Sequence, residues 1–251
     1  MDARELAARL AKLIREAQPC VVLTGAGVST ESGIPDFRSP TGIWAEFDPL
    51  EYASIEAFRR DPAKVWSFYA PRFGMLTDAQ PNDAHRALAA LEEAGYVRAI
   101  VTQNIDLLHE RAGSRDVIEV HGSIRTSSCR GCGASYPLAD VVALLEREPA
   151  PSCAACGGVL KPDVVFFGEL LPEHAIERAS ELAREARLLL VVGSSLEVYP
   201  VAGLPLETVQ AGGRLAIVNR DPTPFDGDAE LVVHAAAGET LRAVAAELGL
   251  Y

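Results

Sequence analysis

The sequence predicts an α/β protein whose core is a doubly wound parallel sheet, with a small domain inserted into it. Three observations support this fold class. Short apolar runs alternate with helical patterns along most of the chain. Almost every run ends in small, polar or titratable residues. Two Cys-x-x-Cys pairs stand in a segment where the alternation stops.

The alternation can be followed from run to run. Buried parallel strands are apolar on both faces, as are the runs Cys20–Thr24, Ala99–Thr102, Val117–Val120, Val164–Phe167, Leu188–Val192 and Leu215–Val218. Helical periodicity covers the amphipathic residues 1–18 and the stretches Asp83–Ala94, Pro172–Ala186, Val201–Ala211 and Glu239–Leu248. Such alternation predicts a doubly wound sheet. Because ligands bind at the carboxyl ends of its strands, we expect the functional site at that edge.

Four cysteines form the two Cys-x-x-Cys pairs, with 20 residues between the pairs: Cys129, Cys132, Cys153 and Cys156. Four thiolates at this spacing are typical of a closed tetrahedral zinc site. A disulfide framework does not suit a long intracellular chain, and a redox Cys-x-x-Cys does not normally occur twice. A nucleic-acid-binding zinc ribbon is the alternative, although few basic residues flank the pairs. We expect one structural Zn²⁺ and a reaction that takes place elsewhere.

Two segments stand outside the sheet pattern. Ser39–Gln80 is rich in aromatic residues and proline, which predicts a loop with short helices. Arg125–Lys161 holds the cysteine pairs and one short helix near Leu138–Leu145. We therefore expect a Rossmann-like domain made of residues 1–40, 81–124 and 162–251. The small domain would combine a helical module, 41–80, with a zinc-binding module, 125–161.

The composition is that of a soluble globular protein. Of 251 residues, 49% are hydrophobic and 23% are charged, and the formal net charge is −12. This charge does not suit nucleic-acid binding; it favours cationic partners such as Lys-rich segments, or serves solubility alone. No signal peptide or membrane-spanning run is evident. We expect a cytoplasmic monomer with reduced cysteines, Cys20 being a small buried residue.

Gly25-Ala26-Gly27 follows the first predicted strand, where glycines let a backbone approach a pyrophosphate. The usual dinucleotide fingerprint would have a third glycine at Thr30 and an acid about 20 residues further on, at the end of a strand. Neither is present. The motif indicates an unusual phosphate site or, alternatively, a tight strand–helix turn.

Asp36, Phe37 and Arg38 belong to a stiff loop that contains Gly and Pro. Arg38 suits a phosphate and Phe37 suits a sugar or a flat ring. A structural ion pair between Asp36 and Arg38 is the alternative.

Gln103-Asn104-Ile105-Asp106 ends one strand and His121 ends another. An amide and a carboxylate at that position suit ribose hydroxyls or a carboxamide, whereas a helix N-cap is the simpler reading. A histidine that faces a ligand crevice can titrate near neutrality and act as a general base. The other four histidines are expected on the surface or in the core.

Together, these motifs make the chain resemble the sirtuin family, the NAD-dependent protein deacylases. The resemblance covers nearly the whole chain and follows the family's order of segments: 25–39 (GAGVSTESGIPDFRS), 103–106 (QNID), 121–122 (HG), the cysteine pairs, 164–169 (VVFFGE), 193–200 (GSSLEVYP) and 218–219 (VN). It implies that NAD is the co-substrate and that acyl-lysine proteins or peptides are the partners. The products would be nicotinamide, 2′-O-acyl-ADP-ribose and free lysine.

The resemblance also implies roles for individual residues. His121 would be the general base, acting with Asn104 and Asp106. The NAD site would consist of Gly25, Ala26, Gly27, Thr30, Asp36, Phe37, Arg38, Trp44, Gln103, Asn104, Ile105, Asp106, Gly193, Ser194, Ser195, Asn219, Arg220, Asp221 and Ala237. The peptide would be bound as an added β-strand by Val165, Phe166, Phe167, Gly168, Glu197, Val198 and Tyr199.

The sequence leaves open which acyl group is removed from lysine. Tyr69 and Arg72 form a Tyr-x-x-Arg motif, with Arg72 nine residues ahead of Pro81, which is similar to sirtuins that remove succinyl and malonyl groups. A phenol and a guanidinium suit a carboxylate. Alternatively, Tyr69 packs and Arg72 is exposed on a helix; Asp36 fits deacetylases better, and Pro71 could displace Arg72.

Two further functions use the same NAD motifs. A non-catalytic NAD or ADP-ribose sensor would have no need for His121 beside Asn104 and Asp106. A protein mono-ADP-ribosyltransferase would apply the same NAD activation to a protein acceptor.

Overall fold

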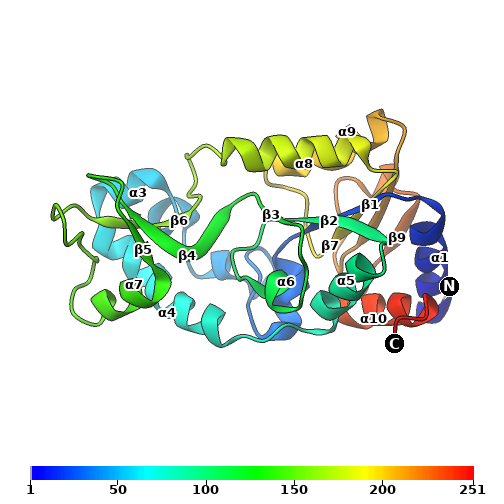
Figure 1. The fold of residues 1–251 in the computed structure, drawn as a ribbon, viewed down its shortest axis with the longest axis horizontal. Helices are drawn as coiled ribbons and strands as arrows, with labels where there is room; N and C mark the ends of the chain where they lie inside the picture. The colour runs from blue at the N-terminus through cyan, green and yellow to red at the C-terminus, as the bar shows by residue number, and fades with distance from the viewer. Residues whose placement is uncertain (1) are drawn as a thin grey trace.

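Six parallel strands form the main sheet of the computed structural model, which describes residues 2–251 (Figure 1). Their order across the sheet is β3 (Val117–Glu119), β2 (Val97–Thr102), β1 (Cys20–Thr24), β7 (Leu188–Val192), β8 (Arg214–Val218) and β9 (Leu231–Val233). The chain builds outward from β1 in one direction and from β7 in the other. The switch point of this doubly wound sheet therefore lies between β1 and β7, where such sheets open a ligand crevice.

Helices cover both faces of this sheet (Figure 1). One layer contains α1 (Ala3–Glu16), α5 (Asp83–Glu93) and α10 (Ala237–Glu247), and the other contains α8 (Glu173–Glu185), η3 (Val201–Gly203) and α9 (Leu204–Gln210). Alternate residues of one strand point to opposite layers. In β1, Val22 joins the first core, whereas Val21 and Leu23 join the second. The strand is buried at every position, which explains its unbroken apolar sequence.

A second body lies at the end of the molecule away from the two termini (Figure 1). Its antiparallel sheet has the order β5 (Ser135–Pro137), β4 (Gly122–Cys129) and β6 (Leu160–Val164). Its helices are α2 (Pro49–Tyr52), α3 (Ile55–Arg60), α4 (Pro62–Asp78) and α7 (Leu138–Leu145). A separate hydrophobic core, which includes the fully buried Trp66, Phe73 and Phe166, joins these helices to the small sheet. The inserted body is therefore aromatic at its centre, whereas the main cores are aliphatic.

Four short helices lie in the connections between the longer elements. They are η1 (Ala26–Ser32), η2 (Ile43–Ala45), α6 (Leu108–Arg111) and η4 (Asp226–Asp228). None of the helices within residues 2–251 has both the length and the hydropathy needed to cross a bilayer.

The fold class is confirmed, but one predicted strand is wrong. Val164–Phe167 is not a strand of the parallel sheet: β6 ends at Val164 in the antiparallel sheet, and the next residues leave it. The run is apolar because Phe166 is buried in the aromatic core, and a run pattern cannot tell that core from a central strand.

Other differences concern length. The helix α4 extends over 17 residues and includes Pro71, although short helices were expected. The strands β4, β5 and β9 are not among the predicted runs. The domain boundaries proposed from sequence stay a prediction.

Candidate active site

A cavity of about 630 Å³ lies between the carboxyl edge of the parallel sheet and the inserted body. Its walls come from the ends of β1, β2, β7 and β8, from the Ile34–Pro40 loop and from α4. This volume lies in the range of small-molecule and cofactor sites. The site predicted at the strand ends is therefore hollow and large enough for a ligand.

The floor of the cavity is a close backbone crossing at the switch point. The Gly27 N–H donates a 2.8 Å hydrogen bond to the Gly193 carbonyl, and the Gly25 N–H donates to the Val192 carbonyl. A Cβ on Gly27 would lie 2.8 Å from Gly193 Cα, and a Cβ on Gly25 would lie 2.9 Å from the Gly193 oxygen. Glycine is thus required at these two positions because the two chain segments approach each other so closely.

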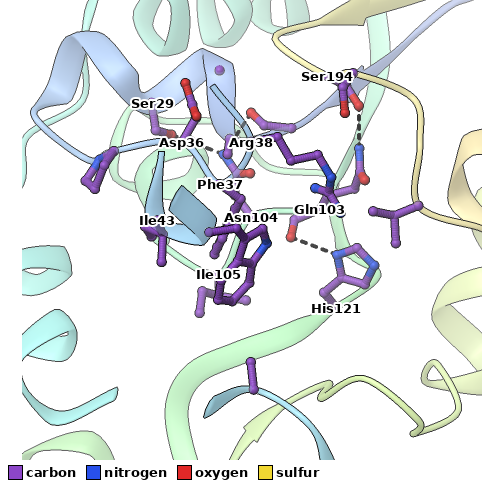
Figure 2. Close-up of a pocket in the computed structure, with 18 of the residues that line it drawn as sticks. Ser29, Asp36, Phe37, Arg38, Ile43, Gln103, Asn104, Ile105, His121 and Ser194 are labelled. Carbon is purple, nitrogen blue, oxygen red and sulfur yellow. Dashed lines mark hydrogen bonds between the residues drawn. The ribbon is translucent and has the colours of Figure 1, made fainter. Parts of the chain in front are cut away.

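His121 stands at the cavity with a defined tautomer (Figure 2). Its Nδ1 lies 3.0 Å from the main-chain carbonyl of Gln103. A carbonyl can only accept, so Nδ1 carries the proton and Nε2 is left with its lone pair. Burial lowers the pKa of His121, and the nearby Arg38 adds to this effect, while the hydrogen bond to Gln103 opposes it. The imidazole is therefore neutral near pH 7 and can accept a proton at Nε2.

The side chain of Gln103 ties this strand end to the switch point. Its amide Nε2 donates to Ser194 Oγ over 2.9 Å (Figure 2) and, more weakly, to the carbonyl of Thr24. One residue thus fixes His121 through its carbonyl and Ser194 through its amide.

A buried hydrogen-bond network holds the next polar side chains. Ser29 Oγ donates to Asp106 over 2.6 Å, and Asn104 Nδ2 donates to Ser29 Oγ over 3.1 Å. Asp106 also accepts from the N–H of Leu108 at the start of α6. Asp106 is not the N-cap of α6, a position that Leu107 holds without a side-chain cap, but it accepts from the N–H two residues further on and orients Ser29 at the cavity wall.

Two histidines lie beneath this network. His85 Nε2 is 3.4 Å from Ser29 Oγ, and the His85 and His109 rings are 4.9 Å apart. His109 Nε2 is 2.9 Å from Thr24 Oγ1. Burial lowers the pKa of His85 to about 4, with Asp106 opposing, and burial likewise lowers the pKa of His109. Both are buried, as the expectation of a core position allows; their hydrogen bonds support the groups that line the site.

The Ile34–Pro40 loop closes one side of the cavity. Asp36 Oδ1 accepts from the Ser39 N–H, and the alternative reading of an Asp36–Arg38 ion pair is wrong. Arg38 Nε instead lies 3.2 Å from Glu197 Oε2 across the cavity, and both side chains are partly exposed. The Phe37 ring packs 5.1 Å from Trp44, centroid to centroid. The loop and η2 together thus present a guanidinium and two flat rings to the cavity.

Tyr69 and Arg72 both line the cavity from α4. Tyr69 is buried and stacks on Phe166 with ring centroids 5.1 Å apart. The Arg72 guanidinium lies 3.7 Å from the centroid of the Phe68 ring and donates to the Phe68 carbonyl. Burial lowers the pKa of Arg72. Arg72 is therefore half-buried at the wall, neither displaced by Pro71 nor fully exposed on the helix.

The four cysteines of the two pairs meet at one point. Their sulfur atoms all lie within 4.8 Å of one another, with Cys129–Cys156 at 3.4 Å and Cys132–Cys153 at 3.7 Å. Tetrahedral zinc with Zn–S bonds of about 2.3 Å holds its sulfurs roughly 3.8 Å apart. Backbone N–H groups of Gly131 and Gly158, and the hydroxyl of Tyr136, donate to these sulfurs. The donor set and its spacing fit Zn²⁺.

Residues 25–200 match the sequence profile of the Sir2 family. The chain belongs to this family, the sirtuins. It is 47% identical over 241 residues to the NAD-dependent protein deacetylase of Caldivirga maquilingensis, covering 96% of this chain and 93% of that protein. The NAD-dependent protein deacetylase of Chromobacterium violaceum is 48% identical, with 93% and 94% covered.

Solved sirtuin structures agree over the full length. A Sir2 structure with a p53 peptide and NAD⁺ has a TM-score of 0.89 and 42% identity, with 100% of both chains covered. A Sir2 structure bound to a propionylated peptide has a TM-score of 0.90 and 42% identity, covering 97% of this chain and 98% of the other.

Most of the NAD and substrate residues predicted from sequence line this one cavity of the sirtuin. Three do not: Thr30 bonds back to the Gly27 carbonyl, Arg220 is exposed nearby, and Ala237 is buried at the start of α10. Met75 and Glu169 line the cavity without having been assigned a role. Glu169 could have been singled out from the sequence, because it is a carboxylate at the end of an apolar run and such a carboxylate needs a partner.

Proposed function

We propose that this sirtuin is an NAD-dependent protein-lysine deacylase that produces nicotinamide, 2′-O-acyl-ADP-ribose and free lysine. The observation that carries the proposal is His121, a neutral imidazole whose Nε2 lone pair is available at the cavity while Nδ1 is held by the Gln103 carbonyl. A general base needs this protonation state and a fixed direction. The names of the curated relatives support the same reaction.

The chain's own groups divide the work. When bound, NAD supplies an electrophilic ribose carbon for the acyl-lysine amide. His121 would accept a proton from the ribose hydroxyls at Nε2, and Asn104 and Asp106, which are linked through Ser29, would hold the ribose. The glycine crossing and Ser194 would hold the remainder of the dinucleotide, and the Phe37 ring would shield it from solvent. Correct alignment of ribose and amide supplies much of the rate.

The substrate peptide would lie between the segments that follow β6 and β7. Phe167 and Tyr199, which belong to these two segments, are 38% and 67% exposed, although both are large apolar residues. Exposed apolar side chains at a cavity rim favour a peptide partner. The four cysteines would hold the structural Zn²⁺ away from this groove.

The test is a peptide assay with NAD and a single variant. Acetyl-lysine peptide, NAD and protein are mixed, and the products are identified by mass spectrometry. The proposal predicts free lysine and acyl-ADP-ribose with the native chain and neither with His121→Ala, which should remain folded. Full activity of His121→Ala refutes the role of this residue. A chain that binds NAD without turnover would be a sensor, and one that labels protein with ADP-ribose would be a transferase.

The acyl preference extends the proposal beyond acetyl groups. Arg72 lies at the cavity wall beside Tyr69, and its guanidinium is held by the Phe68 ring and carbonyl. A fixed, half-buried guanidinium suits a carboxylate, so succinyl and malonyl groups would be removed as well.

The matching test compares acyl peptides. Arg72→Met should lower succinyl-lysine turnover about tenfold or more, as expected for a lost charged hydrogen bond, with little change in acetyl-lysine turnover. Arg59→Met is the matched control, because Arg59 is exposed on α3 and pairs with Glu56. Equal losses for both peptides would reject the carboxylate pocket.

We place the protein in the cytoplasm as a monomer that does not bind nucleic acid. All five cysteine thiols are free of disulfides, which suits a reducing compartment. The net charge of −12 opposes contact with a polyanion. Sedimentation of the purified chain tests the monomer, and a gel-shift assay tests nucleic-acid binding.

A further inference from the structure

Lys161 is a buried lysine whose ammonium has three oxygen partners. The residue is 7% exposed. Its Nζ donates to the carbonyls of Pro162 and Val164 over 3.0 and 2.8 Å, and lies 2.8 Å from Glu169 Oε2. An ammonium has three protons, so each has an acceptor. A buried charge is costly without such partners, and here the partners all lie within eight residues of one chain segment.

Glu169 links this charge to the backbone of the same segment. Its Oε2 accepts from the N–H of Phe166 over 2.9 Å as well as from Lys161. The ammonium also lies 4.0 Å from the centroid of the Phe166 ring. Lys161 and Glu169 together therefore close the Val164–Glu169 segment into a fixed turn.

This turn forms one wall of the cavity. All six residues from Val164 to Glu169 line it. The N–H of Val165 donates to the carbonyl of His121 over 2.9 Å, and the N–H of Phe167 donates to the carbonyl of Ala53. The wall thus connects the small sheet to the general base on one side and to the helical module on the other.

Phe166 links Lys161 to Tyr69, one of the two residues proposed to contact the acyl group. Its ring lies between the ammonium and Tyr69, on which it stacks with an interplanar angle of 20°. Burial lowers the pKa of Lys161, but its hydrogen bond to Glu169 opposes that effect. The ion pair is therefore compatible with a charged lysine.

From these contacts we infer that Lys161 is a positioning residue for the acyl-lysine peptide: its ammonium holds Val164–Glu169 in the shape that the peptide strand and the acyl chain require. The inference rests on the proposed deacylase function. Lys161 does not contact the reacting atoms, so it acts through the segment that it fixes. Its loss should loosen the peptide wall and leave the NAD side of the cavity intact.

The experiment measures steady-state constants of the full-length chain for two substrates. Lys161→Met should raise the KM for an acetyl-lysine peptide about tenfold or more, since charged hydrogen bonds are lost. The KM for NAD should change less than about twofold, and Lys161→Arg should restore much of the peptide affinity because it retains the charge. Lys64→Met is the matched control. Lys64 also pairs with a glutamate, Glu51, and lies over an aromatic ring, that of Tyr52, but it does not line the cavity.

A second variant guards against a folding defect. Lys161→Met leaves the Glu169 carboxylate without its partner, whereas Lys161→Met with Glu169→Gln removes both charges and should fold more stably. The double variant should keep native NAD affinity by calorimetry and still show the raised peptide KM. A native peptide KM in this variant, or equal rises in the KM for peptide and for NAD, overturns the inference. Absence of deacylation by the native chain would instead refute the proposed function itself.

Discussion

Gly193→Ala tests the backbone crossing on which the cavity floor depends. Gly193 has φ +62°, and an added Cβ would lie 2.2 Å from Val28 N and 2.5 Å from the carbonyl carbon of Gly27. The left-handed conformation costs about 1–2 kcal/mol for an alanine, and forced overpacking adds about 1–3 kcal/mol. Because each kcal/mol lowers the melting temperature of a chain of this size by roughly 2–4 °C, we expect a fall of about 4–20 °C.

The assay is thermal unfolding followed by circular dichroism, with NAD titration by calorimetry below the transition. Gly212→Ala is the control, because Gly212 has φ +86° but, among the described residues, nothing lies within 4 Å of its added Cβ. The control loses only the stability that the left-handed conformation costs an alanine, and it should bind NAD normally. Gly193→Ala should melt lower than the control and bind NAD weakly. Equal melting temperatures with equal NAD affinities would refute the crossing as the reason for glycine at this position.

Three other predictions concern protons and zinc. Because burial lowers the pKa of His121 below its usual value of about 6.5, the acid loss of the deacylation rate should have its midpoint below about pH 6.5; a midpoint above pH 7 contradicts this. His85 has a pKa of about 4 and stays neutral in the folded chain, whereas the same side chain in the unfolded chain takes up a proton below about pH 6.5. The free energy of unfolding, measured by urea titration, should therefore drop by about 1–3 kcal/mol from pH 7.5 to pH 5. Unchanged urea midpoints would show that this histidine is protonated in the folded chain. Stripping zinc with a chelator should lower the melting temperature and release one metal per chain, as measured by a colorimetric dye; Cys153→Ser should release it faster, and an equal rate argues against four-sulfur coordination.

The main sheet follows from the sequence because its strands are buried on both faces. The strand β1 has exactly the predicted bounds, Cys20–Thr24, and β7 agrees equally well. The same signal misplaced Val164–Phe167, since burial in an aromatic core beside the cavity gives the same apolar run as burial in a sheet. The three-residue strand β9 lies outside the predicted runs.

The residues of the candidate site could be predicted from the sequence, but the contacts between them could not. Motifs at strand ends place Asn104, His121 and Ser194 at one edge, because parallel strands share a direction. Spacing cannot show that Arg38 reaches Glu197 instead of Asp36. Nor does it show that the glycines serve a chain crossing. Such contacts join segments that lie far apart in the chain, and only the packed fold determines them.

The most direct test of the account is the stoichiometry of one turnover. The purified chain is mixed with excess NAD and a limiting acetyl-lysine peptide, and nicotinamide, deacetylated peptide and acyl-ADP-ribose are quantified together by chromatography and mass spectrometry. The account predicts equal amounts of all three products. Deacetylated peptide without nicotinamide, or nicotinamide with an unchanged peptide, would contradict it.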